Sequence, residues 1–405
     1  MFPKRFLLFF IVITLFSCEK EELIPIVETP VATFDETIEY LTVPDYLSTP
    51  INGSELIVPI IILNWIPSPD GVIVNDSVTK AEGVKDWGGV VKTGMTVETI
   101  NQWNLSNNYK VKYSVEEGSK FRGYSNPNAV PYVGIKVVKY INIYQWDIVW
   151  DIDRYRPDYN QIFKKIGLEK MVNDEGIKEV WINWVNYRGD VWIPESNMSS
   201  PLTGDISNSY HRTDDLPIYD KTYVVYGGSF DRWFAEMVHC RGHQLEAQLS
   251  YLNNTFFWQN FVGYPEGEPQ PYNQGGRVGS THFTPNSTGD YDYDNTSLVL
   301  SDIGDWDPNN NGTKVMVNNQ TWKYERTVPF TYPSVYGHDR WGDMSQYKVG
   351  TDPQSGWLIY WLQSIPNKNS GIPYQKDNDN YIVSNWWDLF YNWDETILNN
   401  KKLYQ

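Results

Sequence analysis

Two histidines and two glutamates in the middle of the chain recur at the spacing of a helix: Glu236, His239, His243 and Glu246. Their separations of three, four and three residues place the four side chains within an arc of roughly 80° on a helix. Neutral imidazoles and ionised carboxylates are both ligands of divalent metals at neutral pH, and this stripe contains no Lys or Arg. The pattern predicts a site for a divalent metal such as zinc.

A third histidine follows in a segment with the composition of a turn. His282 stands in the sequence GSTHFTPN, where residues 284–286 predict a turn directly behind it. We expect this turn to bring His282 toward the helix. Glu195 follows a strand predicted at 177–185, and we expect it on a loop beside the same site, because such loops often carry functional groups.

The expected ligand set has three members and one open position. It combines two imidazoles with one carboxylate: His243, His282 and one of Glu236, Glu195 or Glu246. His239 is a further candidate ligand. Three protein ligands leave the fourth position of a catalytic zinc to water. Without a metal, the cluster would supply a general acid and base pair, with these catalytic candidates: Glu236, His243, Glu246 and Glu195.

Two simpler interpretations of the same residues stay open. The polar side of an amphipathic helix is usually solvated, and His282 could simply close a turn. The likeness to the zinc-protease helix is also partial. That motif needs a glutamate directly after its first histidine, and Cys240 follows His239 here.

Four apolar runs predict the strands that would position this helix. The run at 56–65, LIVPIIILNW, is continuous and rich in β-branched residues, which is typical of a strand buried on both faces. Similar runs lie at 132–144, 177–185 and 222–226, and the segment 158–173 has helical spacing. This order predicts an α/β fold with a mixed or mostly parallel sheet flanked by helices.

The helix with the stripe is expected at 229–252, directly after the strand at 222–226, with Ser229 as its N-cap. Crevices at the carboxyl ends of parallel strands are where ligands bind in such folds.

From about residue 256 the chain becomes rich in loops and aromatic residues, with helix-like segments at 356–365 and 384–393. We expect a single domain at 36–405, made of N-terminal strands (50–150), a central α/β layer (151–255) and a loop-rich cover (256–405).

The first residues have the pattern of a secretory signal. Lys4 and Arg5 precede an apolar run at 6–16, which is too short to span a bilayer as a helix, and Cys18 follows. The string LFSC resembles the lipobox of bacterial lipoproteins, and EKEE after it resembles the acidic tether of surface lipoproteins of the Bacteroidota. The resemblance implies a signal peptide at 1–18, a flexible tether at 19–35, and attachment to outer-membrane lipid through acylated Cys18, facing the exterior.

Charge and composition narrow the possible partners. The formal net charge of −17 argues against nucleic acid, whose phosphates would be repelled. Eighteen Trp, 29 Tyr and 16 Phe supply large buried areas. Rings such as Trp386 with Trp387, and Trp357 with Trp361, could form platforms for sugars, although their spacing favours packing in the core. Because Cys18 carries the expected lipid, Cys240 has no partner for an intrachain disulfide.

Several motifs resemble an uncharacterised family of secreted bacterial and fungal proteins: EEGSKFRGY (116–124), KEVWINW and PESNM (178–184 and 194–198), SNS with DLPIYDKTYVVY (207–209 and 215–226), AEMVHCRGHQLEA (235–247), THFTPNSTGDYDYDN (281–295) and SNWWD (384–388). The resemblance brings no activity with it. It implies a shared polar set: Glu195, Glu236, His243, Gln244, Glu246, His282 and Asn286. It also implies that position 239, His in this chain, is often Glu.

Two functions follow from these observations. The first is a surface-anchored hydrolase, metal-dependent or not, that acts on an extracellular polymer. The second is a non-catalytic surface binding protein or adhesin that recognises glycan or protein through its aromatic residues. Clustered and half-buried Glu236, His243 and His282 would favour the hydrolase, whereas dispersed or solvated side chains would favour the binding protein.

Overall fold

The computed structural model describes residues 38–66, 68–74, 96–144, 150–151, 156–184, 196–209, 211–212, 214–229, 234–264, 277–324, 326–327, 348–350, 352–377, 380–383 and 385–403. They belong to one compact unit, Phe34–Gln405. Cys18, the expected tether and Glu195 lie outside the described residues. Within the described part, no helix is both long and apolar enough to cross a membrane.

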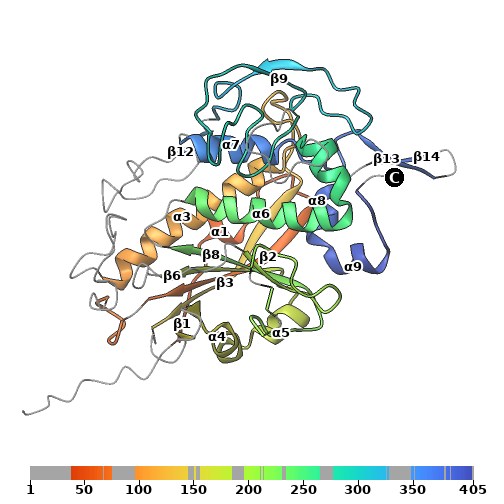
Figure 1. Cartoon of the computed structure of the whole chain (residues 1–405). Coiled ribbons are helices and arrows are strands. Elements are labelled where there is room, and N and C mark those ends of the chain that lie inside the picture. Colours follow the sequence, from red (N-terminus) through yellow and green to blue (C-terminus); the bar gives the residue numbers. More distant parts are fainter. Residues whose placement is uncertain are drawn as a thin grey trace, which may run out of the picture. The chain divides into compact units, whose positions relative to one another are not determined.

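A six-stranded sheet forms the centre of the unit (Figure 1). Its strands are, in spatial order, β1 (Ile38–Leu41), β3 (Val133–Ile143), β2 (Leu56–Trp65), β6 (Glu179–Trp184), β8 (Tyr223–Ser229) and β7 (Ser196–Ser199). The four inner strands are parallel to one another, and the two edge strands are antiparallel to their neighbours. The expected α/β fold with a mixed, mostly parallel sheet is confirmed.

The central strand β2 shows why the sheet needs helices on both faces. From Ile60 to Trp65 every residue is buried, so apolar side chains point both ways. Ile60 and Ile62 belong to a core on one face, and Ile61 and Leu63 belong to a core on the other. A strand with this pattern is stable only where both faces are covered.

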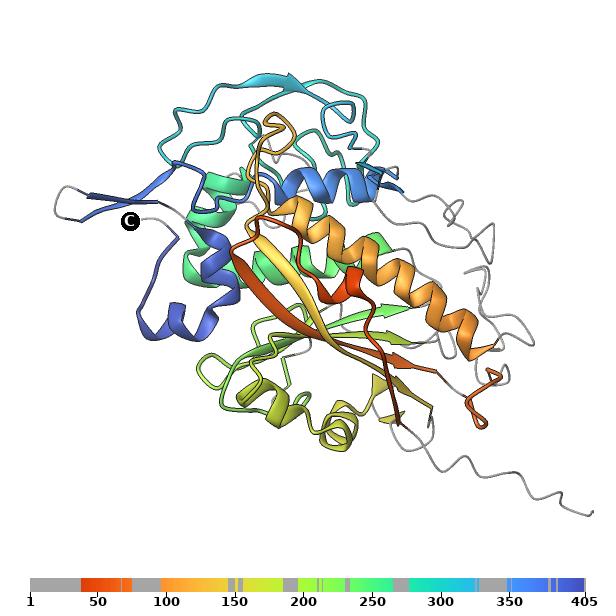
Figure 2. The same ribbon diagram turned by 180° about the vertical axis from the view of Figure 1, so that it is seen from behind.

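Helices cover the two faces of the sheet (Figures 1 and 2). The long helices α3 (Val97–Gly118) and α6 (Phe234–Leu252) lie on one face, and α7 (Pro353–Leu362) packs against both of them. The short helices α4 (Tyr159–Ile166) and α5 (Leu168–Asn173) cover the other face. Figure 2 shows α3 (orange) above the strands of the sheet, with α6 (green) behind it.

The remaining elements are short. Helices are α1 (Asp45–Ser48), the π-helix η1 (Phe256–Val262), α8 (Trp386–Tyr391) and α9 (Trp393–Leu398). Two-stranded sheets join β4 (Trp150–Asp151) with β5 (Arg156–Pro157), β9 (Val299–Ser301) with β10 (Val315–Val317), β11 (Arg326–Thr327) with β12 (Lys348–Val349), and β13 (Pro373–Asp377) with β14 (Asn380–Val383). The indoles of Trp357, Trp361, Trp386 and Trp387 are all buried, so these four rings form core rather than a sugar platform.

The structure differs from the sequence predictions in the helices. Ser229 ends β8, paired with Trp184 of β6, and the described part of α6 begins at Phe234, so the start of this helix and its cap lie outside the described residues. The helix predicted at 158–173 is divided at Gly167, whose φ of 68° ends α4 in the left-handed region. Helix α3 was not predicted, because Asn, Ser and β-branched residues give its sequence low helix propensity.

Candidate metal centre

The two histidines of α6 and His282 come together at one point. The Nε2 atoms are 3.0 Å apart between His239 and His243, 2.9 Å between His243 and His282, and 3.1 Å between His282 and His239. A neutral imidazole carries a single ring proton, so three nitrogens that face one another cannot all be satisfied by hydrogen bonds among themselves. A metal ion between the three nitrogens could accept a lone pair from each of them.

The spacing of the nitrogens matches a metal site. Three imidazole nitrogens bound to one zinc ion at about 2.0–2.1 Å stand roughly 3.3 Å apart in a tetrahedral site. The observed separations differ from this value by less than about half an ångström. The three histidines can therefore hold a metal ion.

Local helix geometry positions two of the three imidazoles. His239 and His243 are one turn apart on α6, so both side chains project from the same face. Their rings meet edge to face, with centres 4.6 Å apart. His239 is fully buried, whereas the side chains of His243 and His282 are 14% and 25% exposed. A bound ion would thus have protein on one side and an accessible edge on the other.

The loop that carries His282 is anchored on α7. The indole Nε1 of Trp357 donates to the carbonyl of Ser280 at 2.9 Å, and that of Trp361 donates to the carbonyl of Gly279 at 3.1 Å. The phenol of Tyr293 donates to the carbonyl of Thr281 at 3.0 Å. Three buried donors therefore fix the backbone immediately before His282.

Gly242 lets this loop approach α6. A Cβ atom at Gly242 would lie 2.5 Å from the Oγ1 atom and 2.9 Å from the Cγ2 atom of Thr281. Real Cβ atoms essentially never come so close to another atom. The glycine between the two helix ligands is thus the point where the loop with His282 crosses the helix.

Glu246 supports the cluster from behind. Its Oε2 atom accepts a hydrogen bond from Nδ1 of His243 at 2.8 Å, and its Oε1 atom accepts one from the backbone N–H of Thr281 at 2.6 Å. Burial raises the pKa of this carboxyl, but attraction to His243 and both hydrogen bonds outweigh it and hold the pKa below its ordinary value. Such a carboxylate fixes the tautomer and orientation of a metal-binding histidine.

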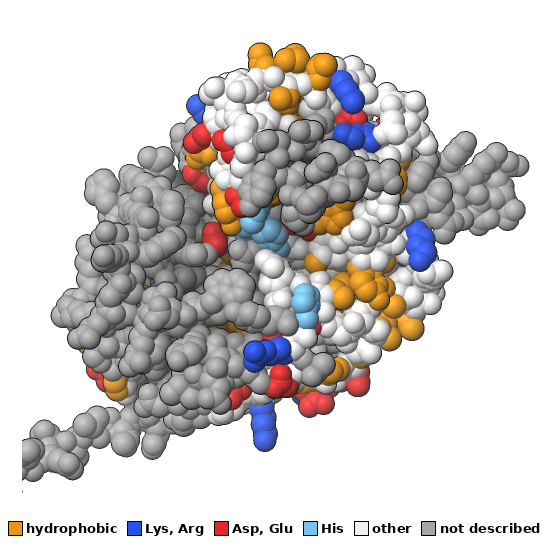
Figure 3. Space-filling view, viewed as in Figure 1, with side chains coloured by type: hydrophobic (Ala, Val, Ile, Leu, Met, Phe, Trp, Pro, Cys, Tyr) orange, Lys and Arg blue, Asp and Glu red, His pale blue; other side chains and the backbone are white. Residues whose placement is uncertain are grey.

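A second acidic residue and an aromatic ring stand beside His282. Oδ1 of Asp290 lies 3.6 Å from Nδ1 of His282. The ring of Tyr291 packs on His282 with its centre 4.4 Å away, and its centre is 5.6 Å from that of His239. Figure 3 shows histidine side chains at the surface of this face of the molecule, bordered by acidic and hydrophobic side chains.

The other described residues expected at the site are not among the three that could hold a metal ion. Glu236 is half-buried, one turn before His239 on α6, and does not belong to the metal-holding group. The two amides implied by the family resemblance form hydrogen bonds within the fold. Gln244 is buried and donates to Gln248 at 3.1 Å, and Asn286 braces the turn behind His282 by donating to the carbonyls of Asn295 and Ser297.

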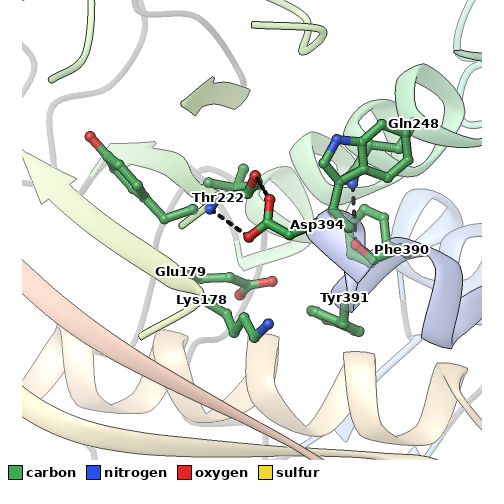
Figure 4. Close-up of a pocket in the computed structure, with 10 residues that line it drawn as sticks. Lys178, Glu179, Thr222, Gln248, Phe390, Tyr391 and Asp394 are labelled. Atoms are coloured by element: carbon green, nitrogen blue, oxygen red, sulfur yellow. Dashed lines mark hydrogen bonds between the residues drawn. The ribbon is translucent and has the colours of Figure 1, made fainter. Parts of the chain in front are cut away.

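A small polar cavity near the amino ends of β6 and β8 offers no comparable chemistry (Figure 4). It measures about 20 Å³, which is enough for roughly one water molecule. Asp394 in its wall accepts hydrogen bonds from the backbone N–H of Thr222 at 3.0 Å and from its hydroxyl at 2.5 Å. The histidine cluster is the stronger candidate for chemistry within the described part of the chain.

Comparisons of the chain with protein-family models, with curated proteins and with solved structures found no match. The function of the chain is therefore inferred from the geometry of its site.

Proposed function

We propose that this chain is a metal-dependent hydrolase that acts on an extracellular polymer, with one zinc ion held by His239, His243 and His282. The observation that carries the proposal is the triangle of Nε2 atoms, 2.9–3.1 Å on a side. Three neutral nitrogen ligands leave one position open, which is the coordination of catalytic rather than structural zinc.

The chemistry expected of such a centre is the activation of water. Zinc with three protein ligands lowers the pKa of a bound water to about 7, which supplies hydroxide at neutral pH. Glu236 is our candidate for the general base, because it is half-buried on the same helix one turn before His239. Glu246 is assigned a positioning role instead, since both of its oxygens already accept hydrogen bonds.

The proposed location is the outer surface of the cell, with acylated Cys18 as the anchor. This part of the proposal rests on the signal-like N-terminus and the acidic residues after Cys18. An enzyme displayed there would meet polymers that cannot enter the cell. The acidic net charge of −17 favours neutral or cationic polymers over nucleic acid.

Two observations favour the hydrolase over the binding protein. His243 and His282 are clustered and only partly exposed, as expected for a reactive site. In addition, the tryptophans that were candidates for glycan stacking are buried in the core. A binding function that uses them would need the core to open.

The first experiment is an elemental analysis of the purified full chain beside its His243→Ala/His282→Ala double variant. We expect about one zinc per chain in the parent protein and none in the double variant, because a single remaining imidazole binds zinc weakly. His211→Asn is the matched control: His211 is an exposed histidine outside the cluster, in a backbone conformation (φ 54°) that asparagine tolerates.

Circular dichroism of all three proteins separates loss of metal from loss of fold. Stoichiometric metal that vanishes only in the folded double variant would support the centre and justify a screen of polymer substrates. A parent protein that binds no transition metal would overturn the proposal.

A further inference from the structure

Tyr291 has an unusual backbone conformation beside the metal centre. Its φ is 60°, in the left-handed region that a bulky residue rarely adopts. The turn around it is well fixed: Asp292 accepts hydrogen bonds from the N–H and the hydroxyl of Thr288, and the N–H of Tyr291 donates to the carbonyl of His282 at 3.2 Å. The backbones of Tyr291 and His282 are thus tied together.

Burial does not explain why this ring lies where it does. Tyr291 is 51% exposed, although its ring packs on His282. A strained backbone that holds an aromatic residue half in solvent gains little from the hydrophobic effect. Strain of this kind persists at functional sites, where the position of the side chain is what matters.

The distances from this ring to the imidazoles fit a shared metal ion. A phenol oxygen and an imidazole nitrogen on one ion, each at about 2.0–2.2 Å from it, place the two ring centres roughly 4–7 Å apart, depending on the angles at the ion and at the oxygen. The ring centre of Tyr291 is 4.4 Å from that of His282 and 5.6 Å from that of His239. The ring also stands by the partly exposed His282 rather than behind the cluster, where Glu246 lies.

We propose that the phenol oxygen of Tyr291 is a ligand of the metal ion, in addition to the three imidazoles. The inference rests on the proposed metal centre and deepens it. Bound to the ion, the phenol would lose its proton to solvent and would take the fourth position as a phenolate. A water molecule that replaced it there would return a proton to the phenolate, and the neutral phenol of Tyr291 could then donate a hydrogen bond to the group under attack.

Copper(II) alone tests this proposal without knowledge of the substrate. The purified full chain, stripped of metal with a chelator, is loaded with one equivalent of copper(II), and its visible absorption spectrum is recorded. We expect the charge-transfer band of a phenolate bound to copper(II). Tyr291→Phe should lose the band while it keeps the bound copper, because the ring contacts are preserved and only the oxygen is removed.

Tyr251→Phe is the matched control, since Tyr251 is exposed to a similar extent (55%) and lies outside the histidine cluster near the end of α6. It should keep the band. A parent protein that binds one copper ion without this band, or a band that survives in Tyr291→Phe, would overturn the role of Tyr291 and leave the centre of three histidines intact. Failure to bind copper or zinc at all would overturn both proposals.

Discussion

Glu246 holds His243 through the ring nitrogen that faces away from the other two imidazoles. Since its two oxygens receive hydrogen bonds from different elements, one from His243 on α6 and one from Thr281 on the loop, it also ties the two ligand-bearing segments together. Its lowered pKa keeps it ionised at neutral pH, so both bonds have a charged acceptor. At the scale of the residue, the site is thus built from a ligand and a partner that orients it.

Glu246→Gln should weaken metal binding. The amide keeps only one acceptor oxygen, so its NH₂ group must face either His243 or the backbone N–H of Thr281, both of which donate. Loss of such a partner typically costs 10- to 100-fold in metal affinity. Competition with a chromophoric zinc chelator measures the change. Glu169→Gln, at an exposed position of α5, should bind zinc like the parent protein. Equal affinity in all three would contradict the positioning role.

At the scale of the elements, the site depends on contact between α6 and the loop at 277–284. The two segments touch at Gly242 and Thr281, and α7 holds the loop from the other side through Trp357 and Trp361. Glycine in the middle of a helix normally destabilises it by about 0.5–1 kcal/mol relative to alanine. The close approach of the loop is therefore the reason for a glycine at this position.

Gly242→Ala should destabilise the protein and weaken metal binding together. The added methyl group would displace Thr281, and His282 would move with it; overpacking of this kind costs about 1–3 kcal/mol. The free energy of urea unfolding and the affinity for zinc are the two quantities to measure. Gly289→Ala is the matched control, because no atom lies within 4 Å of the added Cβ.

A second variant tests whether the clash with Thr281 causes this loss of stability and affinity. Thr281→Ala removes the two atoms that lie closest to the added methyl group, so the Gly242→Ala/Thr281→Ala double variant should recover most of the lost stability and affinity. If Gly242→Ala instead stabilised the helix, as it does in an open environment, the close approach would not constrain the site.

The site was predictable from the sequence to the extent that it depends on helix geometry. The interval of four residues between His239 and His243 determines that both face one side of α6. The identity of the third ligand could be assigned only from the three-dimensional structure. The sequence predicted a carboxylate beside His243 and His282, with His239 as a further candidate. In the structure His239 joins the group, and Glu246 accepts a hydrogen bond from the far nitrogen of His243.

The approach of His282 depends on contacts that sequence spacing does not reveal. The indoles that fix its loop lie in α7, 77 and 82 residues further along the chain from the carbonyls they bind. Helix α3 was missed for a similar reason. Its poor intrinsic propensity is offset by tertiary contacts, such as the hydrogen bond from Asn104 to Asn64 of β2 at 2.9 Å.

At the scale of the whole molecule, a buried ion pair joins the site helix to the sheet and to the C-terminal helices. Arg241 of α6 and Glu179 of β6 are almost completely buried, and the guanidinium forms two hydrogen bonds with the carboxylate, one of them at 2.7 Å. Arg241 also donates to the phenol of Tyr391 in α8 at 2.8 Å. Because Arg241 lies between the two helix ligands in sequence, this pair helps to fix the orientation of α6.

Arg241→Met should be strongly destabilising, because it leaves the Glu179 carboxylate buried without its counter-charge, although the indole of Trp181 still donates to it at 2.8 Å. Removal of one partner from such a pair costs about 3–5 kcal/mol. The free energy of urea unfolding should fall by that amount, and the Glu179→Gln/Arg241→Met double variant should recover part of it, since a neutral amide costs less free energy to bury than a charge.

A full double-mutant cycle, which also includes Glu179→Gln alone, measures the interaction energy between the two side chains. If the double variant were as unstable as the sum of the two single variants, the pair would contribute through packing rather than charge, and α6 would be oriented by its apolar face alone.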